Sequence, residues 1–166
     1  MSIIDMIKAI ILPSKNRVIT GEPVGETVVY EREMAVYNAL RLLISIEQPC
    51  ILGGKYSWLT TSDTRRPLQI DIFFPKITAL SGVELATPRS LAVEVQSSLH
   101  DGRWNNSKKR FFRSKEDFDR YTEHQEWKRN QLQARKIPFI EIDPSVDDLS
   151  PARLRKRLGE LFNIIL

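Results

Sequence analysis

The sequence predicts one mixed α/β domain over residues 1–166, in which helices flank a small β-sheet. Two runs of mainly apolar residues, 68–74 and 91–96, are typical of buried β-strands. A long polar segment with helical spacing, 114–135, separates the second run from a third strand-like run, 137–142. This strand–helix–strand order predicts a right-handed crossover that leaves the last two strands parallel.

Further helices are predicted on either side of this unit. Isoleucines at helical spacing predict a short helix in residues 1–12, which either packs on the domain or associates with a second copy. Ser150 precedes Pro151, a residue suited to the first helical position, and together they predict a helix over 150–164. Residues 26–46 are predicted to be helical because their apolar side chains form a stripe, namely Val29, Met34 or Ala35, Val36, Leu40, Leu43 and Ile44.

The predicted helix at 114–135 has a clear beginning and one apolar face. Ser114 suits the N-cap position, and the acids Glu116 and Asp117 follow in the first turn, where the helix dipole favours them. The side chains that share a face are Phe118, Tyr121, His124 or Gln125, Lys128 and Leu132.

The middle of the chain predicts extended structure. Residues 51–75 are expected to form two strands around the turn "SDTRRP". Pro75 is expected to end the second strand, because proline cannot donate to a β-ladder. Residues 76–90 contain Gly82 and Pro88 and predict a connection with room for a short irregular strand.

The charge and the cysteine content of the chain indicate what kind of partner and which cellular compartment to expect. The formal net charge of +4 favours an anionic partner such as nucleic acid. Residues 101–136 hold 11 Lys or Arg against six Asp or Glu, so the local excess is larger than that of the whole chain. The single cysteine, Cys50, excludes an internal disulfide, suits a reducing compartment and is expected to be a small buried residue. No apolar run reaches the length of a membrane span, so a cytoplasmic protein is expected.

Two carboxylates interrupt the apolar strands. Asp71 lies in "LQIDIFFP" and Glu94 in "LAVEVQSS", and burying either one without a partner is costly. Side chains alternate along a strand, so Gln96 points to the same face as Glu94, and all three converge if the two strands are neighbours. Such oxygen ligands suit Mg²⁺ or Mn²⁺. The alternative is that each carboxylate pairs with a lysine or arginine and only stabilises the sheet.

The order of these residues resembles the PD-(D/E)XK nuclease superfamily, and within it the branch of very-short-patch-repair-like and phage-type homing endonucleases. The similarity covers roughly residues 26–143 and depends on "EMAVYNALRLL", the acid in "LQIDIFFP", "EVQSSLH" and "WKRNQLQARKIPFIEI". It implies a restriction-endonuclease-like core, with the predicted terminal helices as additions. It also implies that Asp71, Glu94 and the Val95 carbonyl bind the metal, that Gln96 lies beside the attacking water, and that Glu33 is a ligand or a base.

Gln96 is where this sequence departs from the superfamily, which usually has lysine at that position. A neutral amide cannot supply positive charge to the attacking water, so either the metal suffices or a cation comes from elsewhere. Lys128 is the first candidate for that cation and Arg129 the next.

The segment after the second predicted strand suggests a nucleic-acid contact, because it combines cations that match phosphates with aromatic rings that stack on bases. The alternative is a solvated basic loop whose rings fold back onto the core. His100 is a candidate acid–base residue or phosphate contact, or an ordinary loop histidine. The candidate contacts are His100, Arg103, Trp104, Lys108, Lys109, Arg110, Arg113 and Arg129.

These observations predict a Mg²⁺-dependent endonuclease that hydrolyses phosphodiester bonds in double-stranded or branched DNA, as a possible homodimer. One alternative is a non-catalytic nucleic-acid-binding module on the same fold. Another is a structural protein whose basic helices bind acidic partners.

Overall fold

The computed structural model describes residues 30–96, 104 and 108–166. It has a four-stranded mixed sheet in the order β1-β2-β3-β4, so the predicted α/β class is confirmed. Strands β1, β2 and β3 pair antiparallel, whereas β3 and β4 pair parallel, as the crossover prediction requires. The strands are β1 (Ile51–Thr60), β2 (Pro67–Leu80), β3 (Val83–Val95) and β4 (Phe139–Ile142).

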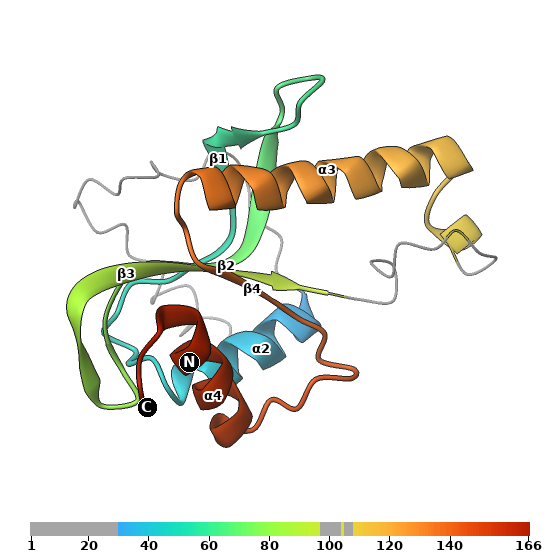
Figure 1. Cartoon of the computed structure of the whole chain (residues 1–166). Helices are drawn as coiled ribbons and strands as arrows, with labels where there is room; N and C mark the ends of the chain where they lie inside the picture. The colour runs from blue at the N-terminus through green and yellow to red at the C-terminus, as the bar shows by residue number, and fades with distance from the viewer. Residues whose placement is uncertain (1–29, 97–103, 105–107) are drawn as a thin grey trace, which may run out of the picture.

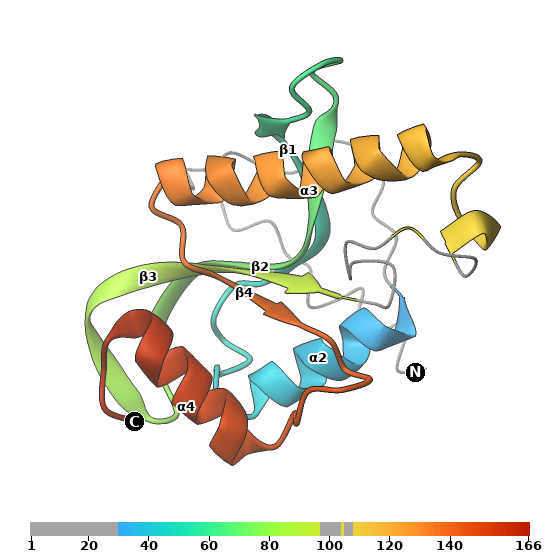
Figure 2. The same cartoon turned by 45° about the vertical axis from the view of Figure 1, so that its right-hand side comes forward.

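Helices cover both faces of this sheet. Figures 1 and 2 show α3 (Lys115–Ala134) crossing one face, with α2 (Glu31–Arg41) and α4 (Pro151–Phe162) on the other. The larger apolar core lies between the sheet and the α2–α4 pair, and a smaller one lies beneath α3. Successive strand residues serve the two cores alternately: Val93 and Val95 belong to the larger, and Ala92 to the smaller.

Helices α3 and α4 begin where the sequence predicts. Ser114 caps α3, since its hydroxyl accepts the Asp117 N–H at 3.2 Å. Pro151 occupies the first turn of α4, and Asn163 ends that helix in the left-handed conformation. The buried residues of α3 are Phe118, Lys128 and Leu132, all on the predicted face.

Helix α2 is shorter than the predicted helix over 26–46. It ends at Arg41 and passes into turns, although Leu43 and Ile44 are buried as the apolar stripe predicts. The helix predicted from the apolar stripe is too long at its carboxyl end, because Leu43 and Ile44 are buried in the turns that follow α2. Residues 26–29 and the predicted helix over 1–12 lie outside the described residues.

The prediction of a connection after Pro75 is wrong, because β2 and β3 form one long hairpin. β2 continues through Pro75 to Leu80, with register shifts that accommodate the proline between Phe74 and Ile77. The hairpin turns at Ser81 and Gly82, both with positive φ. The Ser81 N–H then donates to the Leu43 carbonyl at 2.6 Å, so the tip of the hairpin contacts the end of the α2 segment.

Among the described residues, no helix is long and apolar enough to cross a membrane.

Candidate active site

Asp71 and Glu94 lie opposite each other on neighbouring strands. Ile72 pairs with Val93, so the next position of this antiparallel register sets Asp71 against Glu94. Their strand positions share the face of Phe73 and Ala92, which packs beneath α3. The predicted convergence of these two carboxylates is therefore consistent with the strand register.

Asp71 is held by the backbone of the neighbouring strand. Its Oδ2 accepts the Val95 N–H at 2.8 Å, while Oδ1 has only a long 3.4 Å contact with the Gln69 side chain. No lysine or arginine of the described residues forms an ion pair with Asp71. One of its oxygens therefore keeps most of its capacity to accept.

Glu94 is buried and shares one of its oxygens with a lysine. Its side chain is 7% exposed, and Oε2 accepts from the Lys128 ammonium, which also donates to the Gln69 carbonyl at 2.8 Å. Burial raises the pKa of Glu94 to about 7; Lys128 opposes this shift and the charge of Asp71 adds to it.

Two buried oxygens at this site have no hydrogen-bond partner among the described residues, Glu94 Oε1 and Gln96 Oε1. Unsatisfied buried acceptors are costly, so these two oxygens, one at the end of β3 and one just after it, are available to a donor or a cation.

Glu33 lies within electrostatic reach of Asp71 but is not grouped with Asp71 and Glu94. It is buried on the first turn of α2, where its Oε2 accepts the Tyr30 N–H at 3.0 Å. Burial raises the pKa of Glu33, and the charge of Asp71 raises it further, so the carboxylates of Glu33 and Asp71 act on each other. Among the described residues, no three His, Cys, Asp or Glu side chains are grouped closely enough to hold one metal ion.

Glu141 and Tyr121 are neighbours of the site that the sequence prediction missed. Glu141 pairs with Glu94 in the β3–β4 register, and Arg129 Nε donates to its Oε1 at 2.6 Å. Burial raises the pKa of Tyr121, and the charges of Asp71 and Glu94 raise it further, so its hydroxyl lies near both. Glu141 could have been found from the sequence, because it is an acid within the apolar run "FIEI", just as Asp71 and Glu94 are acids within apolar runs.

The predicted nucleic-acid contacts occupy different environments. His100 and Arg103 lie outside the described residues, as does the side chain of Arg110. Lys108 is 1% exposed and its ammonium lies 5.6 Å from the centre of the Phe118 ring, so a phosphate contact would require it to leave this position. Lys109 is exposed, and Arg113, 96% exposed, has a loose ion pair with Asp117.

The aromatic residues of this segment also differ. Trp104 packs on Phe118 with ring centres 5.6 Å apart, and Phe112 packs on both Phe118 and Tyr121. Phe111, by contrast, is 65% exposed. Trp104 and Phe112 thus fold back onto the domain, as the alternative prediction states, whereas Phe111 is exposed and could stack on a base.

Comparison with known protein families, with curated proteins and with solved structures finds no match to this chain. The resemblance seen in the sequence motifs therefore stays a hypothesis, and the function is inferred from the site.

Proposed function

We propose that this protein is a metal-dependent endonuclease of the PD-(D/E)XK type, which hydrolyses DNA phosphodiester bonds with Mg²⁺ or Mn²⁺. The observation that carries the proposal is the register pairing of Asp71 with Glu94, combined with the buried Glu94 Oε1, which has no hydrogen-bond partner in the part of the chain that the structure describes. A restriction-endonuclease-like core is part of the proposal. What supports it is the position of the two acids on the middle strands of a mixed sheet, with Glu33 at the start of the preceding helix.

The donor set fits Mg²⁺ better than a metal that needs several protein ligands. Mg²⁺ is usually held by one or two carboxylates and keeps waters or takes phosphate oxygens for the rest. Asp71 Oδ1 and Glu94 Oε1 are the carboxylate oxygens with free capacity, and the Val95 carbonyl is the proposed third ligand. Glu33 is proposed as a base acting beside this pair, because its carboxylate is not grouped with the other two.

The protein groups around the pair have separate roles in the proposed reaction. When bound, a divalent cation lowers the pKa of the attacking water and stabilises the charge that grows on the phosphate. The Gln96 amide would orient the water, because its Oε1 is buried and accepts from none of the described residues. Lys128 lowers the pKa of Glu94 and fixes one of its oxygens, which favours the ionised carboxylate that a metal needs.

The proposed substrate is double-stranded or branched DNA. Lys109 and Phe111 are exposed just ahead of α3, the helix that covers the carboxylate pair. A cation and an exposed ring at that position suit a phosphate and a base. A homodimer, which would bring two sites to two strands, stays a prediction.

A second candidate is a nucleic-acid-binding module without catalysis. The buried Glu94–Lys128 pair favours it, because a carboxylate that is neutralised by a lysine needs no metal. Gln96 would then mark a position where activity is lost.

Replacing Asp71 by asparagine separates the two candidates. The asparagine side chain has nearly the same shape and its oxygen can still accept the Val95 N–H, but it lacks the charge that a cation needs. Cleavage of supercoiled, linear and four-way-junction DNA in Mg²⁺ should be present in the wild type and abolished in Asp71→Asn, while DNA binding persists. Glu84→Gln, which changes an exposed acid on β3, is the matched control and should cleave normally. Wild-type protein that binds these DNAs but never cuts them would support the second candidate.

A further inference from the structure

The cation that Gln96 cannot supply has three nearby candidates, and the structure separates them. Lys128 is buried, and its ammonium already donates to Glu94 and to the Gln69 carbonyl. To reach a phosphate it would have to abandon a buried carboxylate, which is strongly unfavourable. Lys128 therefore holds Glu94 in place and does not contact the phosphate.

Arg129 is only partly committed. Its Nε donates to Glu141, its side chain is half-exposed, and no described residue accepts from its terminal nitrogens. A guanidinium has five donors in a planar fork, so one side can hold Glu141 while the other remains open to a ligand.

Arg32 is the uncommitted cation. It is exposed on the first turn of α2, and its guanidinium lies 5.4 Å from the centre of the Tyr30 ring. In the described part of the chain it has no ion pair and no side-chain hydrogen bond. Arginine stacked on an aromatic ring keeps its edge donors free, which is an arrangement suited to an oxyanion.

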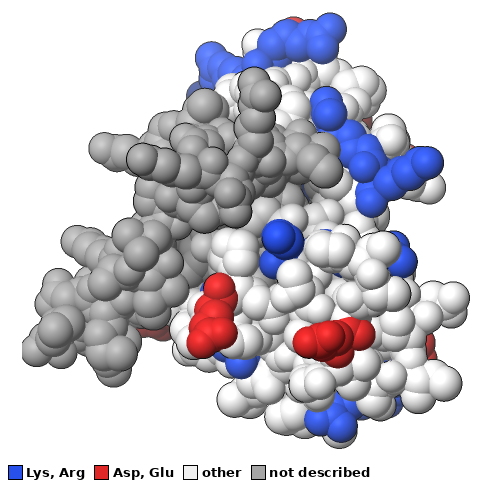
Figure 3. Space-filling model, turned by 90° about the vertical axis from the view of Figure 1, so that its left-hand side faces the viewer, with Lys and Arg blue, Asp and Glu red and all other residues white. Residues whose placement is uncertain are grey.

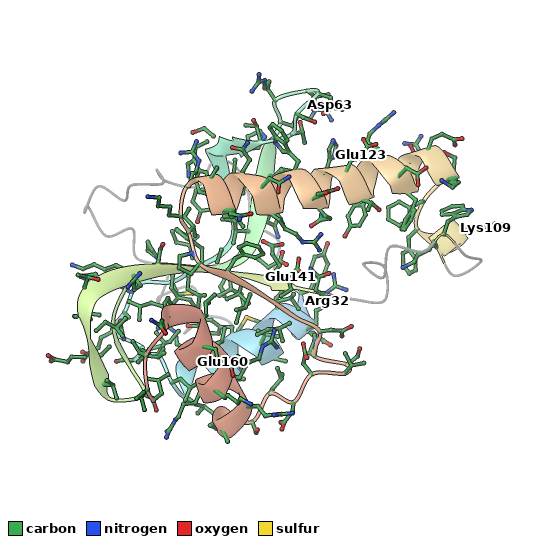
Figure 4. The ribbon with its side chains drawn as sticks, in the orientation of Figure 1. Arg32, Asp63, Lys109, Glu123, Glu141 and Glu160 are labelled. Carbon is green, nitrogen blue, oxygen red and sulfur yellow. The ribbon has the colours of Figure 1, made fainter. Side chains whose placement is uncertain are left out.

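Arg32 and Arg129 come to the same group from different elements. The positive charges of both act on the Tyr121 hydroxyl, which is itself within reach of Asp71 and Glu94. Arg32 also acts on Glu33. Figure 4 shows Arg32 at the beginning of α2 and Glu141, the partner of Arg129, in the same region beneath α3.

We infer that Arg32 binds a phosphate group beside the carboxylate pair, with the terminal nitrogens of Arg129 as the second donors. Arginine grips phosphate through two parallel hydrogen bonds, which fixes the group as well as neutralising it. That the bound phosphate is the phosphodiester under attack rests on the proposed nuclease function. Arg32 then supplies the positive charge that lysine would bring from position 96.

Two measurements test this inference. In single-turnover cleavage of duplex DNA with Mg²⁺, Arg32→Ala should lower the saturating rate of the chemical step about 100-fold, as loss of one transition-state donor does, and should change the half-saturating protein concentration little. Arg32→Lys should recover part of that rate. Arg155→Ala, which removes an exposed helical arginine on α4, is the control and should cleave normally. Separately, the arginine Nε–H signals are followed by NMR, with the Arg32 signal assigned from its absence in Arg32→Ala. Titration with inorganic phosphate, and with a short duplex in Ca²⁺, should shift that signal.

The outcomes distinguish this inference from the proposed function. If the wild type cleaves, Asp71→Asn does not, and Arg32→Ala cleaves within threefold of the wild type, Arg32 is not the phosphate ligand although the nuclease stands. If no protein cleaves but duplex shifts the Arg32 signal, the phosphate site stands and the nuclease fails. A shift with inorganic phosphate but none with duplex restricts the site to free phosphate and overturns the assignment to DNA. No shift and no cleavage would overturn both.

Discussion

Glu94 and Lys128 form the one strongly buried ion pair that the described residues contain, and their environment determines how the pair behaves with pH. The folded-state pKa of Glu94, about 7, lies above its ordinary value of 4.5. Between these two pH values the folded protein holds a proton that the unfolded chain has released. The contribution of Glu94 to stability therefore falls as pH rises through this window.

Replacing Lys128 by methionine should destabilise the protein, and more at pH 8 than at pH 5. Lys128 lowers the pKa of Glu94, so without it this carboxyl at pH 8 must either stay ionised without a partner or take up a proton that the unfolded chain has released, and we expect a loss of up to about 3–5 kcal/mol. At pH 5 Glu94 is protonated with or without Lys128, so the loss is reduced to that of the hydrogen bonds. Urea unfolding at both pH values measures the difference. Lys156→Met, which removes an exposed 3.9 Å pair with Glu160 on α4, is the control and should change stability by less than about 0.5 kcal/mol at either pH. An equal loss for Lys128→Met at pH 5 and pH 8 would contradict the raised pKa.

At the scale of elements, the long β2–β3 hairpin depends on a side chain from outside the sheet. Register shifts interrupt the ladder on both sides of Ile77, and Gln48 supplies hydrogen bonds in that region. Its Oε1 accepts the Thr78 N–H at 2.6 Å and its Nε2 donates to the Ala79 carbonyl at 2.8 Å. The amide therefore satisfies backbone groups of β2 that would otherwise lack partners.

Replacing Gln48 by leucine should destabilise the protein by about 2–3 kcal/mol, because two backbone groups lose their partners. Glu47→Leu, at the exposed neighbouring position, should change stability by less than about 0.5 kcal/mol. Urea unfolding of the two variants measures the contrast. Equal effects would show that water replaces the Gln48 amide at no cost.

The elements also show what local sequence can and cannot predict. The β3–α3–β4 unit was predictable because Ser114 marks the beginning of α3 and apolar runs mark both strands. The β2–β3 hairpin was not predicted, because Pro75 and Pro88 are local signals for a break. Those signals are overridden by register shifts and by Gln48, which is 30 residues away from Thr78 in the sequence.

The same distinction holds for the candidate site. Strand alternation is a local property, so the sequence could place Asp71 and Glu94 each on one face of a strand. That the two meet depends on the pairing of β2 with β3, which the sequence prediction had to assume. That Lys128 would pair with Glu94, and that Arg32 would remain uncommitted, depends on how α3 and α2 pack against the sheet. No spacing in the sequence encodes those contacts.

At the scale of the whole molecule, positive charge gathers on two different surfaces. One lies just ahead of α3 and includes the exposed Lys109 and Arg113. Figure 3 shows another, where Lys and Arg side chains gather in the upper part of the face at the left of Figure 1, toward the β1–β2 turn and α3. Exposed Arg65 and Arg66 belong to that turn, which Figure 1 shows projecting beyond α3.

Salt dependence can show which surface holds DNA. Each cation that contacts a phosphate adds about 0.9 to the magnitude of the slope of log Kobs against log salt. If DNA is bound ahead of α3, as proposed, Lys109→Ala should lower that magnitude by about 0.9, whereas Arg66→Ala should leave it unchanged. The slope is measured by fluorescence anisotropy of a labelled duplex in Ca²⁺ over a range of KCl concentrations. The reverse result would place DNA along the face of Figure 3 and would contradict the proposed contact at Lys109. A slope near zero for the wild type would instead point to a partner other than DNA, because release of condensed counterions necessarily accompanies phosphate contacts.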